Sequence, residues 1–206
     1  MSAPRRIGVF GGAFDPPHMA HVALVRAAID SLQLDEVRVL PTGQAWHRAA
    51  PLSDARHRLA MTRLAFADLQ QVQVDEREIR RQGPSYTVDT LHEIAAECPG
   101  AQLYLLIGDD QRRALPAWRR IEEIARLAII CAASRPADVV PWNTGHVQEP
   151  IPQSLLACIR QLSMPLMHLS ATDIRQRLRL HQSVSGLVPP AVERYIHEHH
   201  LYGQEP

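Results

Sequence analysis

Two glycines followed closely by two histidines form the segment of this sequence best suited to chemistry. The segment Gly11–His21 reads GGAFDPPHMAH and comes directly after a short apolar run. Glycines let a backbone approach a ligand closely, and a helix that begins after them points unpaired N–H groups and the positive end of its dipole at an anion. His18 and His21 share one face of such a helix and can donate hydrogen bonds to phosphate oxygens, which favour protonated imidazoles. The segment therefore predicts a phosphate site.

Each half of this pattern also has a plain interpretation. A Gly-Gly pair after a strand is often only a turn, and a His-x-x-His pair can be a surface coincidence or half of a metal site. The two halves occur here together with Phe14, Asp15 and Pro16 in one short segment. That combination favours a functional site over either plain interpretation.

The charged residues restrict what the site can bind and how it binds it. The 22 basic side chains balance the 22 acidic ones, and every basic side chain is Arg. Zero net charge argues against a sequence-independent nucleic-acid binder, which needs a basic surface to displace counterions. The absence of Lys from the sequence removes Schiff-base chemistry and the phosphate-binding lysine of a Walker A loop. A small phosphate ligand must then be met by Arg, His, backbone amides or a metal.

Apolar β-type runs alternate with helical patterns along the chain, which predicts a doubly wound α/β sheet. Such alternation is typical of parallel strands with helices on both faces. We expect a single domain over residues 1–206, with its ligand at the carboxyl ends of the strands, near the point where the strand order reverses. The predicted strands are Arg6–Phe10, Val37–Leu40, Val72–Val74, Leu103–Ile107, Leu127–Cys131 and Leu166–Leu169.

The helices are predicted from apolar spacing and from capping residues. Ser53, Thr87 and Ser170 are the expected N-caps of three helices, and Ser170 has capping-box spacing to an acidic residue. Two prolines start the last helix, as expected at a first helical turn. Residues 134–152 contain five Pro or Gly and predict a long irregular loop, either functional or a surface excursion. The predicted helices are Met19–Leu32, Asp54–Phe66, Val88–Glu97, Ala171–Leu180 and Ala191–His200.

The cysteines do not suggest a disulfide framework, and the histidines near the end of the chain do not suggest a metal site. The cysteines have no C-x-x-C spacing and are expected to be small buried hydrophobes in a reducing compartment. Three histidines near the end lack acidic or Cys partners at metal spacing and are interpreted as a solvated helix end. The residues concerned are Cys98, Cys131, Cys158, His197, His199 and His200. No apolar run approaches the roughly 18 residues of a membrane span, so we expect a soluble cytoplasmic protein.

Four segments of the chain together resemble a known enzyme family. Gly11–His21 is similar to the G-G-x-F-D-P-x-H-x-G-H signature of nucleotidyltransferases related to class I aminoacyl-tRNA synthetases, and Leu169–Arg175 is similar to their I-S-S/A-T-x-I-R signature. Pro84–Leu91 and the stretch from Ile107 to Trp118 resemble segments of bacterial nicotinate mononucleotide adenylyltransferases. Ala20 stands where the family usually has Gly, and Ala171 replaces the second Ser of the other signature.

The resemblance implies a Rossmann-like sheet and an adenylyl transfer from ATP to a mononucleotide phosphate. The second pKa of a phosphate monoester is about 6, so this nucleophile is largely anionic at neutral pH and needs no general base. Catalysis then depends on positioning and on neutralising the leaving pyrophosphate, a task for His18, His21 and Arg175 together with Mg²⁺ carried by ATP. The implied ATP-binding residues are Gly11, Gly12, Ala13, Phe14, His18, His21, Gly108, Ser170, Thr172 and Arg175.

The mononucleotide side of the site is implied less directly. Trp118 offers an aromatic face for a pyridine ring, and the helix start at Tyr86 and Thr87 offers amides to a carboxylate. Ordinary packing and an ordinary helix cap are the alternatives. The resemblance also implies that Asp109 binds a ribose and that two loops approach the substrate phosphates. The implied substrate-binding residues are His47, Arg48, Tyr86, Thr87, Asp109, Trp118 and Arg135.

Several alternatives to the nicotinate substrate stay open. Nicotinamide mononucleotide or 4′-phosphopantetheine could accept the adenylyl group, although phosphopantetheine enzymes are typically shorter and lack the middle segments. A non-catalytic nucleotide sensor could keep the fold, but it would not need His18, His21 and Arg175 to stabilise a leaving group. A truncated tRNA synthetase is disfavoured because the lysine loop of that family is missing. We expect ATP and nicotinate mononucleotide as the partners, without nucleic acid or membrane, and the oligomeric state leaves no mark in the sequence.

Overall fold

The computed structural model describes residues 3–43, 52–134, 159–164 and 167–203 and has an open parallel sheet at its centre. Within these residues the sheet has six strands in the order β3-β2-β1-β4-β5-β6. From β1 the chain builds outward on one side to β3, then crosses to β4 on the other side of β1 and builds outward to β6. This order confirms the doubly wound sheet, with its switch point between β1 and β4. The strands are β1 (Arg6–Gly12), β2 (Glu36–Pro41), β3 (Val72–Val74), β4 (Gln102–Ile107), β5 (Ala128–Ser134) and β6 (Ile159–Ser163).

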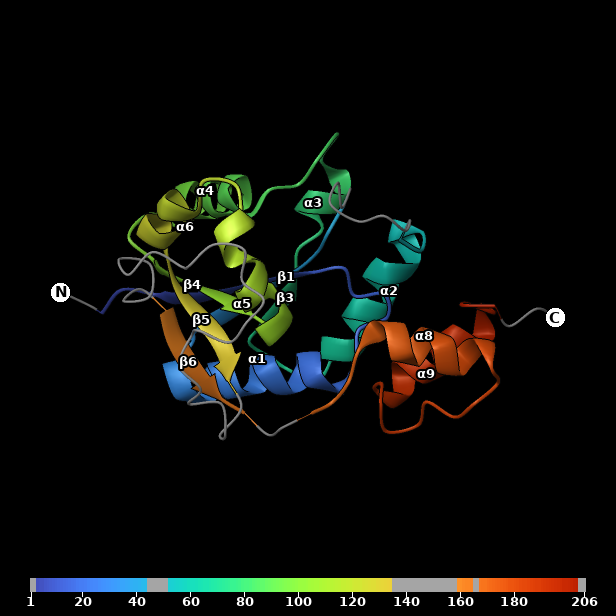
Figure 1. The fold of residues 1–206 in the computed structure, drawn as a ribbon. Coiled ribbons are helices and arrows are strands. Elements are labelled where there is room, and N and C mark those ends of the chain that lie inside the picture. The colour runs from blue at the N-terminus through green and yellow to red at the C-terminus, as the bar shows by residue number, and fades with distance from the viewer. Residues whose placement is uncertain (1–2, 44–51, 135–158, 165–166, 204–206) are drawn as a thin grey trace.

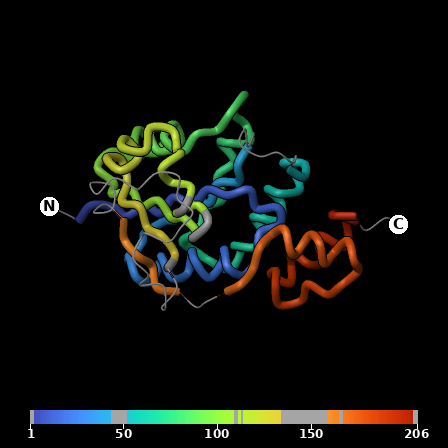
Figure 2. The backbone as a smooth tube through the Cα atoms, in the orientation of Figure 1, coloured from blue at the N-terminus to red at the C-terminus, as the bar shows by residue number. Residues whose placement is uncertain are grey.

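Helices cover both faces of the sheet (Figure 1). Helices α4 and α6 lie on one face and α1 on the other, while α2, α8 and α9 gather beyond the carboxyl end of β1. The smooth trace in Figure 2 shows that the start of β1 and the α8–α9 region lie at opposite ends of the molecule. The bounds are α1 (Met19–Leu32), α2 (Ala55–Phe66), α3 (Arg77–Arg80), α4 (Thr87–Glu97), α5 (Asp109–Ala114), the 3₁₀ turn η1 (Leu115–Ala117), α6 (Ile121–Leu127), α8 (Ala171–Arg179) and α9 (Pro190–Glu198).

The core has two layers because side chains alternate along each strand. On β1, Ile7 and Val9 pack with the apolar residues of α4 and α6, whereas Phe10 packs with those of α1. The same alternation along β4 sends Leu105 to the first layer and Leu106 to the second. Strands buried on both faces read as continuous apolar runs, which is why the central strands were predictable from the sequence.

The sixth strand was predicted in the wrong place. Residues Ile159–Ser163 form β6 beside β5, whereas Met167–Leu169 form no strand and lead into α8. Leu166 and most of the predicted irregular loop lie outside the described residues. β6 is an edge strand in which only Leu162 is fully buried, so it has no continuous apolar run to reveal it.

The helix caps were predicted with mixed success. Ser170 is confirmed as the N-cap of α8, where its hydroxyl oxygen accepts a hydrogen bond from the amide N–H three residues on, at 3.1 Å. Asp54, not Ser53, caps α2 through a 2.8 Å bond from the second following N–H. Tyr86 is the N-cap of α4, and Thr87 is its first helical residue. Ser53 and Thr87 were therefore each assigned one position away from the actual cap.

Helix α3 is fixed against both β2 and α4. A Cβ on Gly43, just after β2, would lie 2.0 Å from the carbonyl oxygen of Glu78, so only glycine fits there. On the other side, Arg77 of α3 donates hydrogen bonds to both carboxylate oxygens of Glu97 at 2.9 Å. Arg77 and then Arg38 lower the pKa of Glu97 to about 2. These contacts set the path of the chain between α3 and α4.

Two further expectations concerned the cysteines and membrane-spanning helices. Cys131 is buried and Cys98 is half-buried, both as free thiols, while Cys158 lies outside the described residues. In the part of the chain that the structure describes, none of the helices combines the length and the apolar character that a membrane span requires.

Candidate active site

The switch point brings two predicted ligand segments side by side. β1 ends at Gly12 and continues through a loop into α1, and the adjacent β4 ends at Ile107. Gly108 follows as the N-cap of α5, so the start of this short helix lies at the same edge of the sheet. The carboxyl edge between β1 and β4 is where open parallel sheets bind ligands.

The two glycines of the first motif have different roles. Gly11 and Gly12 belong to β1, paired with the end of β2, rather than to a turn. A Cβ on Gly12 would lie 2.9 Å from the ring of Phe14, whereas a Cβ on Gly11 would meet no protein atom within 4 Å. Phe14 has a positive φ of 48° and is 1% exposed, with its ring against Phe10 and His21. Its side chain belongs to the core beneath the loop, which leaves its backbone for a ligand.

The first turn of α1 differs from the sequence-based expectation. The N–H of Met19 donates to the carbonyl oxygen of Leu187 at 2.9 Å, and the N–H of His21 donates to the carbonyl oxygen of His18 at 2.9 Å. The N–H of His18 donates to Nδ1 of His21 at 3.1 Å. These amides already have protein acceptors, so α1 does not present an open row of unpaired N–H groups to an anion.

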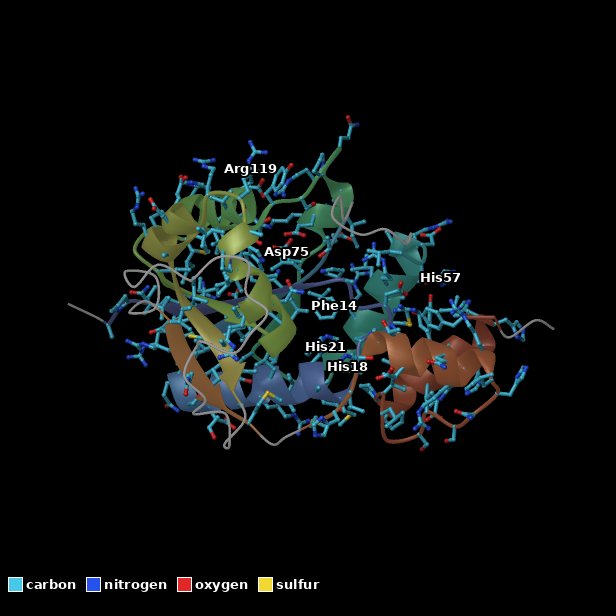
Figure 3. The ribbon with its side chains drawn as sticks, in the orientation of Figure 1. Phe14, His18, His21, His57, Asp75 and Arg119 are labelled. Carbon is cyan, nitrogen blue, oxygen red and sulfur yellow. The ribbon has the colours of Figure 1, made fainter. Side chains whose placement is uncertain are left out.

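The two histidines form one stacked unit at this helix start. Their ring centroids are 3.7 Å apart with an interplanar angle of 20°. Figure 3 shows both at the N-terminal end of α1, below Phe14. Because Nδ1 of His21 accepts a hydrogen bond, the proton of the neutral ring is on Nε2. Burial of the ring, and secondarily the neighbouring His18, lowers the pKa of His21 well below its usual value. Without a ligand, His21 is thus a neutral N–H donor. The sequence alone predicts a protonated imidazole, because phosphate oxygens favour that form.

Arg175 connects the second motif to the first. Its Nη1 donates to the carbonyl oxygen of Asp15 at 2.7 Å, and its Nη2 donates to the hydroxyl of Thr172 at 3.3 Å. Arg175 is half-buried, whereas Arg177 and Arg179 on the same helix are exposed. The structure therefore distinguishes Arg175 from its neighbours and places its guanidinium against the loop that leads into the helix start with both histidines.

Sequence reasoning missed Arg58. This α2 side chain is 2% exposed; its Nη1 donates to the carbonyl oxygens of Ala13 and Thr42 at 2.9 and 2.7 Å, and its Nε donates to that of Ser53 at 2.9 Å. It therefore joins the first-motif loop, the end of β2 and the start of α2. The available signal was its helical spacing, because Arg58 shares the buried face of α2 with Met61.

Asp15 was part of the first motif, but sequence reasoning gave it no role. The residue is buried, at 4% exposed. One oxygen accepts from the hydroxyl of Tyr202 at 2.7 Å, and the other accepts from the N–H of Ser53 at 3.1 Å. Burial, followed by the charge of Asp15, raises the pKa of Tyr202, which stays a hydrogen-bond donor. Asp15 thus ties the loop to two segments that are remote in sequence.

The predicted pyridine-binding residues lie around the start of α4. Tyr86 and Trp118 both pack against the apolar layer beneath α4 and α6, and the guanidinium carbon of Arg119 lies 4.5 Å from the ring centre of Tyr86. Thr87 starts α4, and Asp109 is the first residue of α5. The structure thus brings the Trp118 segment to the start of α4, while His47, Arg48 and Arg135 lie outside the described residues.

The histidines of the last helix are exposed, as expected, but one of them has ring contacts. His199 packs on Tyr195 with ring centroids 4.1 Å apart, and the hydroxyl of Tyr195 lies 3.0 Å from Nδ1 of His57. His57 lies on α2, away from the stacked pair His18 and His21 (Figure 3). Within the described ranges, no group of three or more His, Cys, Asp or Glu residues is arranged to hold a metal ion.

Two solved structures of one enzyme share this fold. Nicotinic acid mononucleotide adenylyltransferase of Plasmodium falciparum, complexed with APC, superimposes with a TM-score of 0.74 at 18% identity, covering 96% of this chain and 97% of that one. The same enzyme complexed with NaAD gives a TM-score of 0.74 at 20% identity and the same coverage. At these identities the likeness establishes the fold.

Sequence comparison identifies the family. The model described as Cytidylyltransferase-like matches residues 9–177. A relative from Albidiferax ferrireducens, named "Probable nicotinate-nucleotide adenylyltransferase", is 54% identical over 199 residues, which are 96% of this chain and 98% of the relative. A relative of the same name from Chromobacterium violaceum is 44% identical over 208 residues, covering 96% and 98%. The chain therefore belongs to the cytidylyltransferase-like family, among the nicotinate-nucleotide adenylyltransferases.

Proposed function

We propose that this protein transfers the adenylyl group of ATP to nicotinate mononucleotide, forming deamido-NAD and pyrophosphate in NAD biosynthesis. The observation that carries the catalytic part is the contact between Arg175 and Asp15, which joins two motifs 160 residues apart at the switch point of the sheet. The choice of acceptor is supported by relatives that match the chain over nearly its whole length. We expect the enzyme to work in the cytoplasm on small molecules alone.

In this reaction a phosphate oxygen of the mononucleotide attacks the α-phosphorus of ATP. A bond forms between these atoms, the bond to the β-phosphate oxygen breaks, and pyrophosphate takes the electron pair. The nucleophile is already anionic at neutral pH, because the second pKa of a phosphate monoester is about 6. The protein must therefore align the two phosphates and stabilise the charge that grows on pyrophosphate.

His18, His21 and Arg175 are the catalytic residues in this proposal. His21 donates from Nε2, because its Nδ1 is occupied by the N–H of His18. Arg175 supplies a permanent charge, and its contacts with Asp15 and Thr172 use two of its five N–H donors, so others can reach phosphate. Gly11 adds space at the strand end, since nothing in the described residues would contact a Cβ there. Backbone groups from Gly12 to Phe14, the start of α5 at Gly108, and Ser170 complete the ATP side.

Nucleotidyltransferases generally use a divalent metal with ATP, and we propose Mg²⁺ carried on the nucleotide phosphates. The donors gathered at the site, imidazole and guanidinium N–H groups, suit phosphate oxygens rather than a metal. Asp15 supplies the carboxylate of the first motif, and both of its oxygens already accept hydrogen bonds. When bound, Mg²⁺ would neutralise phosphate charge, while the residues above orient the phosphates.

Nicotinate mononucleotide would bind at the start of α4. The N–H of Asp89 already donates to the carbonyl oxygen of Tyr86 at 3.1 Å. The N–H of Thr87, at the first position of the helix, has no acceptor within the helix and can receive the pyridine carboxylate. Tyr86 and Trp118 supply aromatic surface beside them. Asp109, at the start of α5, is proposed to bind the ribose. His47, Arg48 and Arg135 are proposed to approach the substrate phosphates.

The first test of this function compares acceptors. With Mg²⁺-ATP, pyrophosphate release should be fast with nicotinate mononucleotide and much slower with nicotinamide mononucleotide or 4′-phosphopantetheine, since only the first carries the carboxylate that suits the α4 amides. Release with a different acceptor would remove the proposed carboxylate site. If folded protein binds ATP but releases no pyrophosphate with any acceptor, the chain is a nucleotide sensor.

Replacing His18 should impair chemistry more than binding. We expect His18→Ala to lower kcat by about 100-fold with a much smaller change in ATP affinity, because its contact should strengthen as charge develops on the leaving group. Steady-state kinetics and calorimetry with a non-hydrolysable ATP analogue separate the two effects. His92→Ala, which removes an exposed histidine paired with Glu123, is the matched control. Near-normal turnover of His18→Ala would exclude His18 from the mechanism.

The protonation of His21 can be measured directly. In ¹⁵N NMR the free enzyme should show a neutral ring protonated on Nε2, with a pKa below the usual 6.5. Because folding lowers this pKa, the stability contribution of neutral His21 is complete above about pH 6.5 and is lost as the pH falls below that value. His21→Asn keeps an acceptor for the His18 N–H but does not titrate, so its unfolding free energy should depend less on pH. A proton on Nδ1 would contradict the proposed donor.

Two substitutions of Trp118 separate stacking from packing. Trp118→Leu keeps an apolar side chain but removes the aromatic face, and we expect it to weaken nicotinate mononucleotide binding about fivefold. Trp118→Phe should restore most of this loss, and neither variant should change ATP affinity, measured separately by calorimetry. Equal loss of both ligands, or full activity of Trp118→Leu, would show that Trp118 has only a packing role.

A further inference from the structure

The loop that carries the histidines is attached at two points to the C-terminal segment of the chain. The carbonyl oxygen of Leu187 accepts the N–H of Met19 at 2.9 Å, at the start of α1. The hydroxyl of Tyr202, after α9, donates to Asp15 at 2.7 Å. The loop and the helix start are therefore hydrogen-bonded to two residues that lie more than 160 positions away in sequence.

The contact between Asp15 and Tyr202 is linked through the backbone of Asp15 to the position of Arg175. Asp15 is buried. Its carboxylate accepts hydrogen bonds from the hydroxyl of Tyr202 and from the N–H of Ser53. The main-chain carbonyl of the same residue accepts from Arg175 at 2.7 Å. A shift of Asp15 would therefore move the acceptor that holds the Arg175 guanidinium.

We infer that Tyr202 is a positioning residue for adenylyl transfer, acting through Asp15 on Arg175 and on the loop that ends at His18. The inference rests on the proposed catalytic roles of His18 and Arg175. Tyr202 does not touch the reacting atoms in this scheme. Its hydroxyl fixes one oxygen of a buried carboxylate, and the backbone attached to that carboxylate fixes the arginine. A displacement of about 1 Å at catalytic groups can cost up to about 100-fold in rate.

A second tyrosine in the same region provides a matched control. Tyr195 of α9 also uses its hydroxyl to contact α2, at 3.0 Å from Nδ1 of His57. Its ring packs with His57 and His199. Within the described residues, it makes no hydrogen bond or ring contact with Asp15, Arg175 or the loop. Tyr202→Phe and Tyr195→Phe therefore each remove one hydroxyl that joins the C-terminal segment to the rest of the protein, but only the first hydroxyl leads to Arg175.

The test compares kcat, KM for nicotinate mononucleotide and thermal stability for both variants. We expect Tyr202→Phe to lower kcat about tenfold and to change that KM less than about twofold, because Tyr202 packs against the apolar layer of α1, whereas α4 belongs to the other layer. Tyr195→Phe should lower the Tm by a similar amount and leave kcat within about twofold of the parent. A loss of kcat below twofold for Tyr202→Phe, or equal losses for both variants, would overturn the inference.

A double-mutant cycle tests whether the effect passes through Asp15. In an Asp15→Ala background, Tyr202→Phe should cause less than about a twofold further loss of kcat, since the partner of the hydroxyl is already gone. Additive losses would mean that Tyr202 acts by another route and would contradict the inference. Should Asp15→Ala fail to fold, the comparison of the two tyrosine variants still decides.

The outcomes separate this inference from the proposed function. If the parent enzyme is active and His18→Ala is not, the function stands, and the Tyr202 variant tests the inference alone. If the parent shows no transfer with any acceptor, the proposed function fails. In that case the imidazole NMR signals of His18 and His21 still report on the loop, and they should move in Tyr202→Phe but not in Tyr195→Phe. Unmoved signals would overturn the inference.

Discussion

A loop proposed to meet phosphate with N–H groups must have its own carbonyl oxygens satisfied by something else. Buried carbonyl groups without partners cost about 1–3 kcal/mol each, so a protein cannot leave them unpaired behind an anion site. Here two arginines meet that demand. Arg58 takes the carbonyl oxygens of Ala13 and Thr42, and Arg175 takes that of Asp15. The path of the loop, and with it the placement of both histidines, depends on these contacts.

This arrangement suits a chain whose basic side chains are all arginines. The guanidinium group carries five N–H donors in a rigid plane, so one side chain can bind several carbonyls along fixed directions. Arg58 does this with three segments at once. A lysine would place a more strongly hydrated point charge in the same position, with less directional control. For the same reason Arg175 can hold the loop and also make its proposed contact with phosphate, because its donors point in different directions.

The sequence predicted the parts of this protein that depend on local pattern. Continuous apolar runs revealed the buried strands, and the Ser170 cap followed from its spacing to Asp173. The edge strand β6 was misplaced because an edge needs few apolar residues, as Arg160 and Gln161 show. The contacts of Asp15 with Tyr202 and Ser53 were beyond reach, since they join residues 187 and 38 positions apart and neither partner has a local signal. Local patterns reveal which residues line a site, whereas the bonds that hold them in place are mostly long-range.

The three-residue spacing of the histidines has a structural cause that the phosphate argument alone does not supply. An N3 side chain can reach back to the N–H of the N-cap residue, a place usually taken by Glu or Gln in a capping box. His21 occupies that position and accepts the N–H of His18. A glutamate would cap the helix equally well but would set a negative charge beside the incoming phosphates. Imidazole satisfies the same backbone donor with a neutral nitrogen, and that bond places its remaining proton on Nε2, the nitrogen proposed to face the ligand. One side chain thus caps the helix and, in the proposed reaction, would also recognise phosphate.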